Sequence, residues 1–552
     1  MIHNGFTIKV LFEPFSVCYS NNNNGKFTKD TICYEDDGYI IILDGIILNR
    51  KDLLSGTNLA WEKLVVERLS KEGVGFVNLM NGSFYGALVD KNNKKCIAFT
   101  DKLGTKFLYS YQDSNMLIIS SMMSQMYEAL RENSIHYTLD VESAYMLLSF
   151  GYMLGEKTLC DSVFKILPGS WVEFSHNNRK NKRYYEIGLK EKSADSFNDA
   201  VNNIDTLFRQ AISREFEKDL EYDYTHCVAL SGGLDSRMTC WVAHDMGYTN
   251  QLNFTFSQIG YHDQIIPQNI VKDLNHNWIF KSLDNGLWLY NIDTVTKLTG
   301  GNVLYYGLSH AISLYSLINF DNLGIIHSGQ LGDVIIGSKF NHNTIKNSSL
   351  AAGAYSKKLL QKVDYSNYSH YGNTEINWFY ARGFNGTNNG LMCEYSFSET
   401  ASPFMDIDFL EYCLSLPLEY RSNHRIYKKW IIDKYPQAAD YPWESIGAKI
   451  TEPTISICNQ EIPFTQFFPK VIQSLRRKMG LQTSSKGMNP LGLYLKDNSN
   501  LVSFFDSYLP FAEYIKDDSL RDDVIDLYKK GNPTEKLQVL SLLSAIKLFY
   551  CD

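Results

Sequence analysis

Short apolar runs separated by polar turns dominate the first third of the chain. Continuous or alternating apolar runs predict strands, and the Asn-rich or charged segments between them predict turns. The strands expected on this basis lie at 38–48, 96–101 and 116–121. Two segments have helical spacing instead: 58–70, with Trp61 and Leu64 on one face, and about 139–148. The pattern predicts an α+β domain dominated by antiparallel sheet.

A polar and basic stretch at 176–195 ends this pattern. Such a stretch is typical of a solvated turn and linker, so we expect a domain boundary there. The first domain is then expected to cover residues 1–185 and the second residues 195–552.

Helices and strands alternate beyond the boundary. An amphipathic helix around 200–216 leads into a strand at 227–230, and further strands are expected at 252–257 and 324–329. This alternation predicts an α/β domain with a doubly wound parallel sheet, whose ligands bind outside the carboxyl ends of the strands. From about residue 350 onward the pattern is mainly helical.

Composition narrows the classes of function. The 552 residues are 44% hydrophobic and 21% charged, which fits a globular protein. A net charge of −8 and a pI of about 5.9 argue against a general nucleic-acid binder. The ten cysteines form no C-x-x-C pair, which favours reduced thiols in the cytoplasm over zinc or disulfides. The N-terminus does not resemble a signal peptide, so none is expected. A membrane span needs roughly 18 consecutive apolar residues, and the sequence contains no such run.

The segment CVALSGGLDSR at 227–237 carries the strongest chemical signal. A strand ends at Leu230, two glycines follow, and an amphipathic helix begins near Asp235. Glycine lets the backbone approach a ligand closely, and a helix N-terminus offers free N–H groups and a positive dipole end. Phosphate is therefore the expected ligand. The alternative is an ordinary strand–turn–helix connection that is rich in Ser and Gly.

The SGGLDS run resembles the pyrophosphate-binding loop of the N-type ATP pyrophosphatases, which cleave ATP between its α and β phosphates. No G-x-x-x-x-G-K-[ST] string occurs, so γ-phosphoryl transfer is disfavoured. A second motif, SGQLGD at 328–333, follows another predicted strand. The pair resembles the asparagine synthetase family, in which SGGLDS precedes SGEG-x-D-E at a similar spacing.

Further segments are similar to the same family. ETASPFMD at 399–406 resembles its E-x-R-x-P-F-L-D, and Asp263 occupies the place of an acidic pair. Stretches similar to its amidotransferase half lie at 42–54, 81–111 and 167–174. The resemblance implies an N-terminal-nucleophile-hydrolase-like sandwich in the first domain and an ATP pyrophosphatase-type synthetase domain in the second.

The first domain departs from the family at the site of glutamine hydrolysis. Glutamine-hydrolysing members carry a nucleophilic cysteine after the initiator Met, whereas position 2 here is Ile. Asp44 stands where an asparagine is expected. We therefore expect a glutaminase fold without glutaminase activity, which serves as a structural or partner-binding platform. In the second domain, Gln330 replaces the glutamate of asparagine synthetases and the tyrosine of β-lactam synthetases.

The resemblance also implies roles for single residues. Asp235 and Asp333 would hold Mg²⁺, with a helix-capping aspartate as the alternative for Asp333. Lys449 would stabilise charge on the reacting carbonyl, or be a surface lysine. Glu399 would orient or deprotonate an amine, or be a structural cap, and Gln330 is the third catalytic candidate. The nucleotide would be bound by Leu230, Ser231, Gly232, Gly233, Asp235, Ser236, Phe256 and Gly329; Leu230 and Phe256 are equally typical of a plain core.

These features predict an ATP-dependent amide-forming ligase with ATP and Mg²⁺ as cofactors. It would adenylate a carboxylate of a small molecule, sugar acid or peptide and release pyrophosphate. The nitrogen would come from free ammonia, from a separate glutaminase, or from a substrate amine, as in β-lactam synthetases and lasso-peptide cyclases. The alternative is a non-catalytic nucleotide-binding scaffold or regulator.

Overall fold

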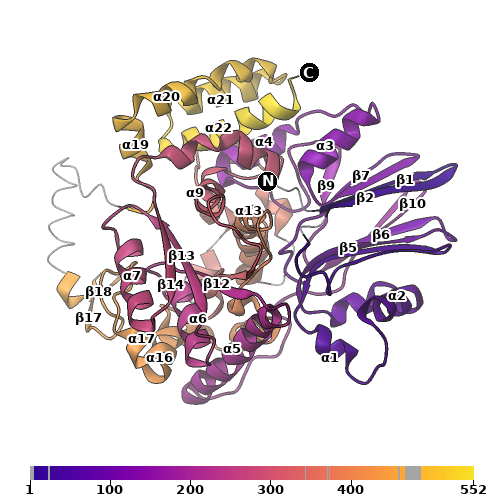
Figure 1. The fold of residues 1–552 in the computed structure, drawn as a ribbon. Coiled ribbons are helices and arrows are strands. Elements are labelled where there is room, and N and C mark those ends of the chain that lie inside the picture. The colour runs from indigo at the N-terminus through magenta and orange to yellow at the C-terminus, as the bar shows by residue number, and fades with distance from the viewer. Residues whose placement is uncertain are drawn as a thin grey trace.

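Two antiparallel sheets form the N-terminal part of the chain (Figure 1). The computed structural model describes residues 5–22, 25–341, 344–347, 349–369, 371, 373–457, 460–466 and 487–551. One sheet has the order β2-β1-β8-β7-β9 and the other β11-β10-β6-β5-β4-β3. The strands are β1 (Gly5–Phe12), β2 (Phe15–Asn22), β3 (Ile32–Glu35), β4 (Tyr39–Ile47), β5 (Gly82–Asp90), β6 (Lys95–Thr100), β7 (Tyr109–Gln112), β8 (Met116–Ser120), β9 (Val163–Lys165), β10 (Ser170–Ser175) and β11 (Asn178–Arg183).

The two sheets pack face to face. Alternate residues of a strand point to the same side, so Phe6, Ile8 and Val10 of β1 face inward together. They share a buried cluster with Ile42 of β4 and Val89 of β5 in the opposite sheet. The N-terminal part is therefore an antiparallel sandwich; the strand pattern predicts the antiparallel sheet, and the family resemblance implies the sandwich.

Helices cover the outer faces of this sandwich. Trp61 and Leu64 of α2 (Trp61–Glu72) pack on the second sheet, as their helical spacing predicts. On the first sheet, Ile118 shares a cluster with buried residues of α3 (Met123–Glu132) and α4 (Val141–Phe150). The short helix α1 (Arg50–Leu54) precedes α2.

The expected linker is partly a strand. Asn178–Arg183 forms β11, which pairs with β10 from Ser170 to Ser175 and lies at the edge of the sheet. Charged side chains, lysine above all, suit an edge strand because they discourage pairing with other chains. The basic residues at 178–183 therefore belong to the sandwich, which corrects the expectation of a solvated turn. The expected domain limits stay predictions.

A five-stranded parallel sheet forms the centre of the C-terminal part, in the order β14-β13-β12-β15-β16. The strands are β12 (Thr225–Ala229), β13 (Gln251–Ser257), β14 (Asn277–Ser282), β15 (Leu323–His327) and β16 (Thr400–Ala401). The three expected strands are present as β12, β13 and β15. Strand β12 lies between the other two, so the three carboxyl ends lie next to one another.

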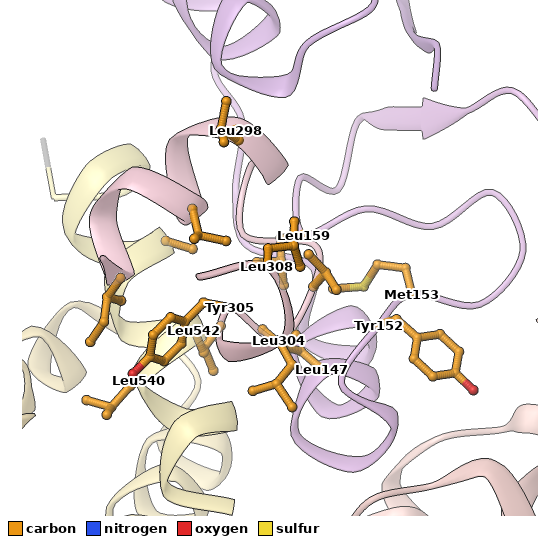
Figure 2. Packing of buried hydrophobic residues seen from close by; sticks show 14 of the residues in the cluster. Leu147, Tyr152, Met153, Leu159, Leu298, Leu304, Tyr305, Leu308, Leu540 and Leu542 are labelled. Atoms are coloured by element: carbon orange, nitrogen blue, oxygen red, sulfur yellow. The ribbon is translucent and has the colours of Figure 1, made fainter. Parts of the chain in front are cut away.

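Helices cover both faces of the parallel sheet. Val228 of β12 faces a cluster with α5 (Phe197–Leu220), α6 (Leu234–Asp245) and α7 (His262–Leu274). The neighbouring Cys227 faces the opposite cluster, which includes α8 (Ile292–Thr299), α9 (Tyr306–Tyr315) and α22 (Pro533–Phe549). That second cluster also contains Leu147 of α4, which lies close to Leu304 in Figure 2, and Leu540 of α22. The N-terminal and C-terminal parts thus share a hydrophobic core.

The region after residue 350 is mainly helical, as predicted. Its last helix, α22, packs against α4 and α8. The remaining elements are α10 (Gly332–Ile335), α11 (Thr344–Asn347), α12 (Thr374–Trp378), α13 (Leu391–Glu394), α14 (Ile407–Ser415), α15 (Leu418–Arg421), α16 (Arg425–Lys434), α17 (Pro436–Ala439), β17 (Thr454–Ile457), β18 (Gln460–Pro463), α19 (Leu491–Asp497), α20 (Ser499–Asp506) and α21 (Asp518–Lys530). Figure 1 shows α19, α20, α21 and α22 on the same side of the molecule as α4. Among the helices of the described residues, none is both long and apolar enough to cross a membrane.

Candidate functional site

The SGGLDS loop connects the carboxyl end of β12 to the start of α6. Its two serines hold it together: Ser231 N donates to Ser236 Oγ at 2.9 Å, and the two hydroxyl oxygens lie 3.0 Å apart. Gly233 is the N-cap of α6, and its N–H donates to Ser231 Oγ at 3.3 Å. The loop therefore lies at the positive end of a helix dipole, as the sequence predicts.

Two aspartates from different motifs meet beside this loop. Asp333, in the first turn of α10, donates its backbone N–H to Asp235 Oδ2 at 2.9 Å. Tyr427 of α16 donates its hydroxyl to Asp235 Oδ1 at 2.8 Å. Loss of solvent and the neighbouring Asp333 carboxylate raise the pKa of Asp235 to about 8. A divalent cation would relieve this repulsion, and carboxylate oxygens are the ligands that Mg²⁺ prefers.

Glycines allow the two motif loops to touch. A Cβ on Gly329 would lie 2.4 Å from Ser236 N, and a Cβ on Gly332 would lie 2.7 Å from Asp235 Cγ. Both distances are too short for real atoms, so these positions need glycine for the loops to pack. Gly329, expected to bind the nucleotide, thus has a packing role in this structure.

An acidic side chain binds the loop where phosphate is expected. Gly232 N donates to Asp263 Oδ1 at 2.8 Å, and burial raises the pKa of Asp263. Glu444 lies on the same side: its backbone N–H donates to Gly232 O at 3.2 Å, and its carboxylate accepts from Tyr261. The N–H of Gly232 therefore already donates to a carboxylate, the kind of acceptor that a helix N-terminus favours.

Arg237 fixes the segment that leads toward Lys449. Its guanidinium is fully buried and donates to the carbonyls of Ala438 and Tyr441 at 3.1 Å and of Gly232 at 3.2 Å. Burial lowers the pKa of Arg237 to about 10, so the group stays charged at neutral pH. Sequence reasoning missed this residue, although it directly follows SGGLDS.

Lys449 lies at the surface. Its side chain is 50% exposed and its Nζ pairs with Asp440 Oδ1 at 3.1 Å. Among the contacts of the described residues, none joins Lys449 to the SGGLDS loop. Its catalytic role stays a prediction.

Leu230 and Phe256 lie on opposite faces of the parallel sheet. Leu230 is buried in the cluster with α5 and α6. Phe256 packs against the other cluster, with its ring 4.5 Å from that of His310. Their assignment to one adenine pocket stays a prediction, and both side chains have packing partners here.

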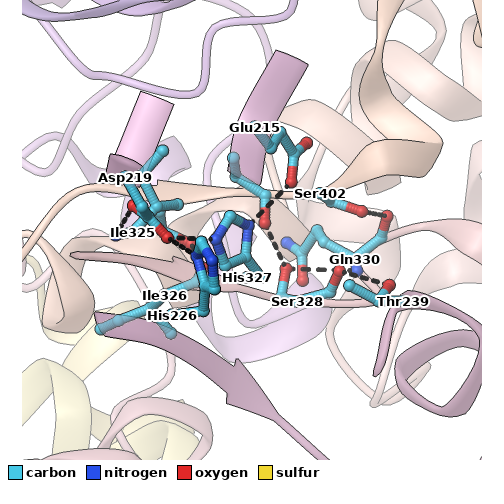
Figure 3. Close-up of polar contacts among 12 residues, drawn as sticks. Glu215, Asp219, His226, Thr239, Ile325, Ile326, His327, Ser328, Gln330 and Ser402 are labelled. Atoms are coloured by element: carbon cyan, nitrogen blue, oxygen red, sulfur yellow. Dashed lines mark hydrogen bonds and ion pairs between the residues drawn. The ribbon is translucent and has the colours of Figure 1, made fainter. Parts of the chain in front are cut away.

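Gln330 faces the junction between the two parts. Its side-chain Nε2 donates to Thr387 O at 3.0 Å. Its backbone carbonyl accepts from Ser402 Oγ at 3.0 Å (Figure 3). Gln330 lines a cavity of about 50 Å³ with Lys102 of the N-terminal part and Glu215 of α5. This candidate therefore lines a small cavity between the two parts.

A buried network of charged residues lies beside Gln330 in the view of Figure 3. Asp219 Oδ2 contacts His226 Nδ1 and His327 Nε2, each at 2.8 Å, and His327 Nδ1 contacts Glu215 Oε2 at 3.1 Å. Burial opposes the charge on His327, yet the two carboxylates raise its pKa to about 9. Potential metal-ligand atoms of Asp219, His226 and His327 lie within 4.8 Å of one another. Their mutual hydrogen bonds already satisfy these atoms, so the network is a self-contained ion cluster.

Glu399 also lies at the junction of the two parts. Its Oε1 accepts from Lys106 Nζ of the N-terminal part at 2.7 Å, and both side chains are buried. Asp44, the residue at the expected asparagine position, accepts from Tyr85 OH at 3.0 Å in the same region. Ile2, on which the expected loss of glutaminase activity rests, lies outside the described residues.

Comparison with known proteins identifies the N-terminal part. Residues 27–185 match the glutamine amidotransferase domain family. The chain is 29% identical over 218 residues to a glutamine-hydrolysing asparagine synthetase 3 of Bacillus subtilis (strain 168), an alignment that covers 37% of this chain and 33% of that protein. The chain thus spans about a third of the length of this curated relative. It therefore contains a glutamine amidotransferase-like domain and is similar to an asparagine synthetase over part of its length.

Two solved structures are also similar. One is the glutamine phosphoribosylpyrophosphate amidotransferase from B. subtilis complexed with ADP and GMP, with 8% identity and a TM-score of 0.21; the match covers 45% of this chain and 58% of that one. The other is the allosteric regulatory enzyme of purine biosynthesis, with 7% identity and a TM-score of 0.23; the match covers 50% of this chain and 74% of that one.

Proposed function

We propose that this protein is an ATP-dependent amide-forming ligase without glutaminase activity of its own. It adenylates a carboxylate, releases pyrophosphate, and transfers the acyl group to ammonia or an amine. The observation that carries the proposal is the pairing of Asp235 and Asp333, from two motifs, at the start of α6 and α10. Partial similarity to an asparagine synthetase supports the same class of reaction.

The residues at the SGGLDS loop fit ATP and Mg²⁺. Asp235 and Asp333 offer hard oxygen ligands, and burial together with the Asp333 carboxylate raises the pKa of Asp235. The loop N–H groups and the dipole of α6 favour phosphate oxygens. Bound Mg²⁺ would neutralise charge on the departing pyrophosphate. For phosphate to reach Gly232 N, the Asp263 carboxylate that now accepts this N–H must give way.

The acyl-transfer half of the reaction is assigned to residues near the junction. Gln330 lines the cavity there, and Glu399 offers a carboxylate that accepts a proton from the attacking amine. Lys449 would approach the reacting carbonyl only after leaving Asp440. The carboxylate substrate is a small molecule, a sugar acid or a peptide, and the nitrogen is free ammonia, ammonia from a separate glutaminase, or a substrate amine.

Pyrophosphate exchange tests the proposal. The protein is incubated with ATP, Mg²⁺ and labelled pyrophosphate, together with panels of amino acids, sugar acids and peptides. We expect a carboxylate-dependent incorporation of label into ATP that Asp235→Asn abolishes. Asp245→Asn is the matched control, because Asp245 is an exposed aspartate at the other end of the same helix.

The alternative is a nucleotide-binding scaffold or regulator. The exposed position of Lys449 and its pair with Asp440 favour it. Calorimetry separates the two: a scaffold would bind ATP with Mg²⁺ and give no exchange with any carboxylate. An exchange signal that survives Asp235→Asn would contradict the assignment of the site itself.

A further inference from the structure

A buried ion pair joins the amidotransferase-like part to the C-terminal part. Lys106 Nζ donates to Glu399 Oε1 at 2.7 Å, and the side chains are only 4% and 11% exposed. Lys106 follows β6, and Glu399 immediately precedes β16, the strand next to β15. Gln330 and Glu399 therefore lie near the two ends of the connection from β15 to β16, and Lys106 reaches Glu399 from the opposite side of the junction.

The charged groups around Glu399 include more carboxylates than the one ammonium of Lys106 can neutralise. Lys106 also lies 3.9 Å from Asp44 Oδ2, so one ammonium is shared between two carboxylates. Asp30 raises the pKa of Glu399 from a greater distance, and Lys26 interacts with Glu399 electrostatically. The rings of Tyr85 and Tyr395 lie 5.1 Å and 4.8 Å from Lys106 Nζ, which favours its cationic form.

Glu399 lines a small cavity at the junction. Among the described residues, Glu399 Oε2 is a buried atom with no hydrogen-bond partner. Glu399, Lys106 and Asp44 line a cavity of about 60 Å³ between the two parts. A buried carboxylate oxygen needs a donor, and this cavity has room for one or a few small polar molecules.

The ion pair opposes the effect of burial on Glu399. Burial raises the pKa of Glu399 to about 7, and Lys106 is the main group that holds it down. An opposite charge at this distance typically lowers a carboxyl pKa by about 1–3 units. Without Lys106, the carboxyl group would be neutral at pH 7 and unable to accept a proton.

We propose that Lys106 is a positioning residue that keeps Glu399 ionised, with one oxygen fixed and the other directed into the cavity. The amidotransferase-like part would then serve the ligase reaction through this side chain and not through glutamine hydrolysis. The inference rests on the proposed function. In the reaction, the ammonium form of the nucleophile gives one proton to Glu399 Oε2. The freed lone pair forms the C–N bond to the acyl carbon while the acyl C–O bond to phosphate breaks, and AMP leaves with the electron pair of that C–O bond. The amide nitrogen then loses its second proton to the phosphate of the departing AMP.

Infrared titration tests the proposal without a substrate. Protein labelled with ¹³C at the glutamate side-chain carboxyl is titrated between pH 5 and pH 10, and the Glu399 band is isolated by subtracting the Glu399→Gln spectrum. We expect a midpoint near 7 in the parent. Lys106→Met should raise this midpoint by about 1–3 pH units, and Lys106→Arg should restore it.

Two further variants test whether the midpoint of Glu399 responds to the charges beside it. Asp44→Asn should lower the midpoint, because it removes a negative charge that disfavours ionised Glu399. Lys165→Met is the matched control: Lys165 is another buried lysine that crosses the junction, but it contacts Asn385 and has no carboxylate partner among the described residues. The titration midpoint of Glu399 in Lys165→Met should equal that of the parent. Unchanged midpoints in both Lys106→Met and Asp44→Asn would overturn the proposal and leave the pair as a structural clamp.

An activity measurement separates this inference from the proposed function. With a carboxylate that supports pyrophosphate exchange, Lys106→Met should lower amide formation relative to exchange, and the acid limb of the amide-forming rate should move to higher pH. An equal fall in both rates at every pH would contradict a role in the second step. If no carboxylate supports exchange, the proposed function is wrong. The infrared titration still tests, by itself, whether Lys106 keeps Glu399 ionised.

Discussion

Asp333 donates its backbone N–H to the carboxylate of Asp235 across 2.9 Å, although the two residues lie 98 positions apart. This contact joins the strand ends of β12 and β15, which are neighbours in the sheet. The carboxyl ends of adjacent parallel strands form the usual ligand crevice of such sheets. Burial and the neighbouring carboxylate raise the pKa of Asp235 to about 8, so a proton or a bound cation would stabilise this pair of aspartates.

The first prediction follows from the protonation of Asp235. Its pKa in the folded protein, about 8, exceeds the usual value of 3.8. The stability that the proton contributes is complete below the unfolded pKa and is lost as pH rises through 8. Mg²⁺ competes with this proton, so its affinity should increase with pH up to about 8.

Melting curves with and without Mg²⁺ between pH 6 and pH 9 measure this effect. We expect the gain in melting temperature from Mg²⁺ to grow with pH in the parent and to vanish in Asp235→Asn. Asp245→Asn should behave as the parent does. A gain that does not depend on pH would show that Mg²⁺ binds elsewhere.

The second prediction concerns glutamine. The purified protein should not convert glutamine to glutamate above background, because position 2 offers no thiol nucleophile. Coupled glutamate dehydrogenase detects the product. Cys18 lies in β2 and is exposed. A glutaminase rate that disappears in Cys18→Ala would mean that the reactive cysteine had been misassigned.

Local sequence was enough to predict the elements with strong periodicity. The helix at 58–70 and the strands at 252–257 and 324–329 were predictable because each buries a continuous or periodic set of apolar residues. Strand β14 was missed because it is a half-buried edge strand, NWIFKS, with mixed character. The two residues of β16 adopt strand geometry by pairing with β15, which their own sequence does not encode.

Contacts between residues that are distant in the sequence limit how much of the site can be predicted from the sequence. The motifs predicted that Asp235 and Asp333 lie at adjacent strand ends, and they do. No local pattern links Lys106 to Glu399, which are 293 positions apart and come from different parts of the chain. Arg237 was missed for the same reason, since its partners are carbonyls around residues 438–442.

The third prediction tests Arg237 as a structural anchor. Arg237→Met would leave several buried carbonyls without a donor, and each such loss costs about 1–3 kcal/mol. We expect the free energy of unfolding in urea to fall by at least about 2 kcal/mol. Arg209→Met is the control, because Arg209 pairs with Asp245 at the surface and should change stability little. Equal effects of the two substitutions would contradict the anchoring role.

The fourth prediction follows from the imidazolium of His327. Its pKa is raised from 6.5 to about 9 by Asp219 and Glu215, against the effect of burial. The resulting stabilisation is complete below the unfolded pKa and is lost as pH rises through 9. His327→Gln should therefore remove part of the decrease in stability between pH 6.5 and pH 9.

Urea denaturation at several pH values measures this change. His136→Gln serves as the control, since His136 is an exposed histidine of the N-terminal part. The pH profile of that variant should match the parent. A His327→Gln profile as steep as that of the parent would mean that His327 is neutral in the folded protein.

The last prediction concerns Lys449. If it approaches the reacting carbonyl, its charge acts mainly when negative charge develops on the carbonyl oxygen and the bridging phosphate oxygen. Loss of one such contact costs about 2.7–4 kcal/mol, or roughly a hundred- to a thousandfold in turnover. The ground-state complex depends on it less, so the apparent affinity for ATP should change little in Lys449→Met. Asp440→Asn frees Lys449 from its present partner and should not reduce turnover. Single-turnover assays with the carboxylate found by pyrophosphate exchange measure both variants, and a turnover of Lys449→Met within a few-fold of the parent would identify Lys449 as a surface lysine.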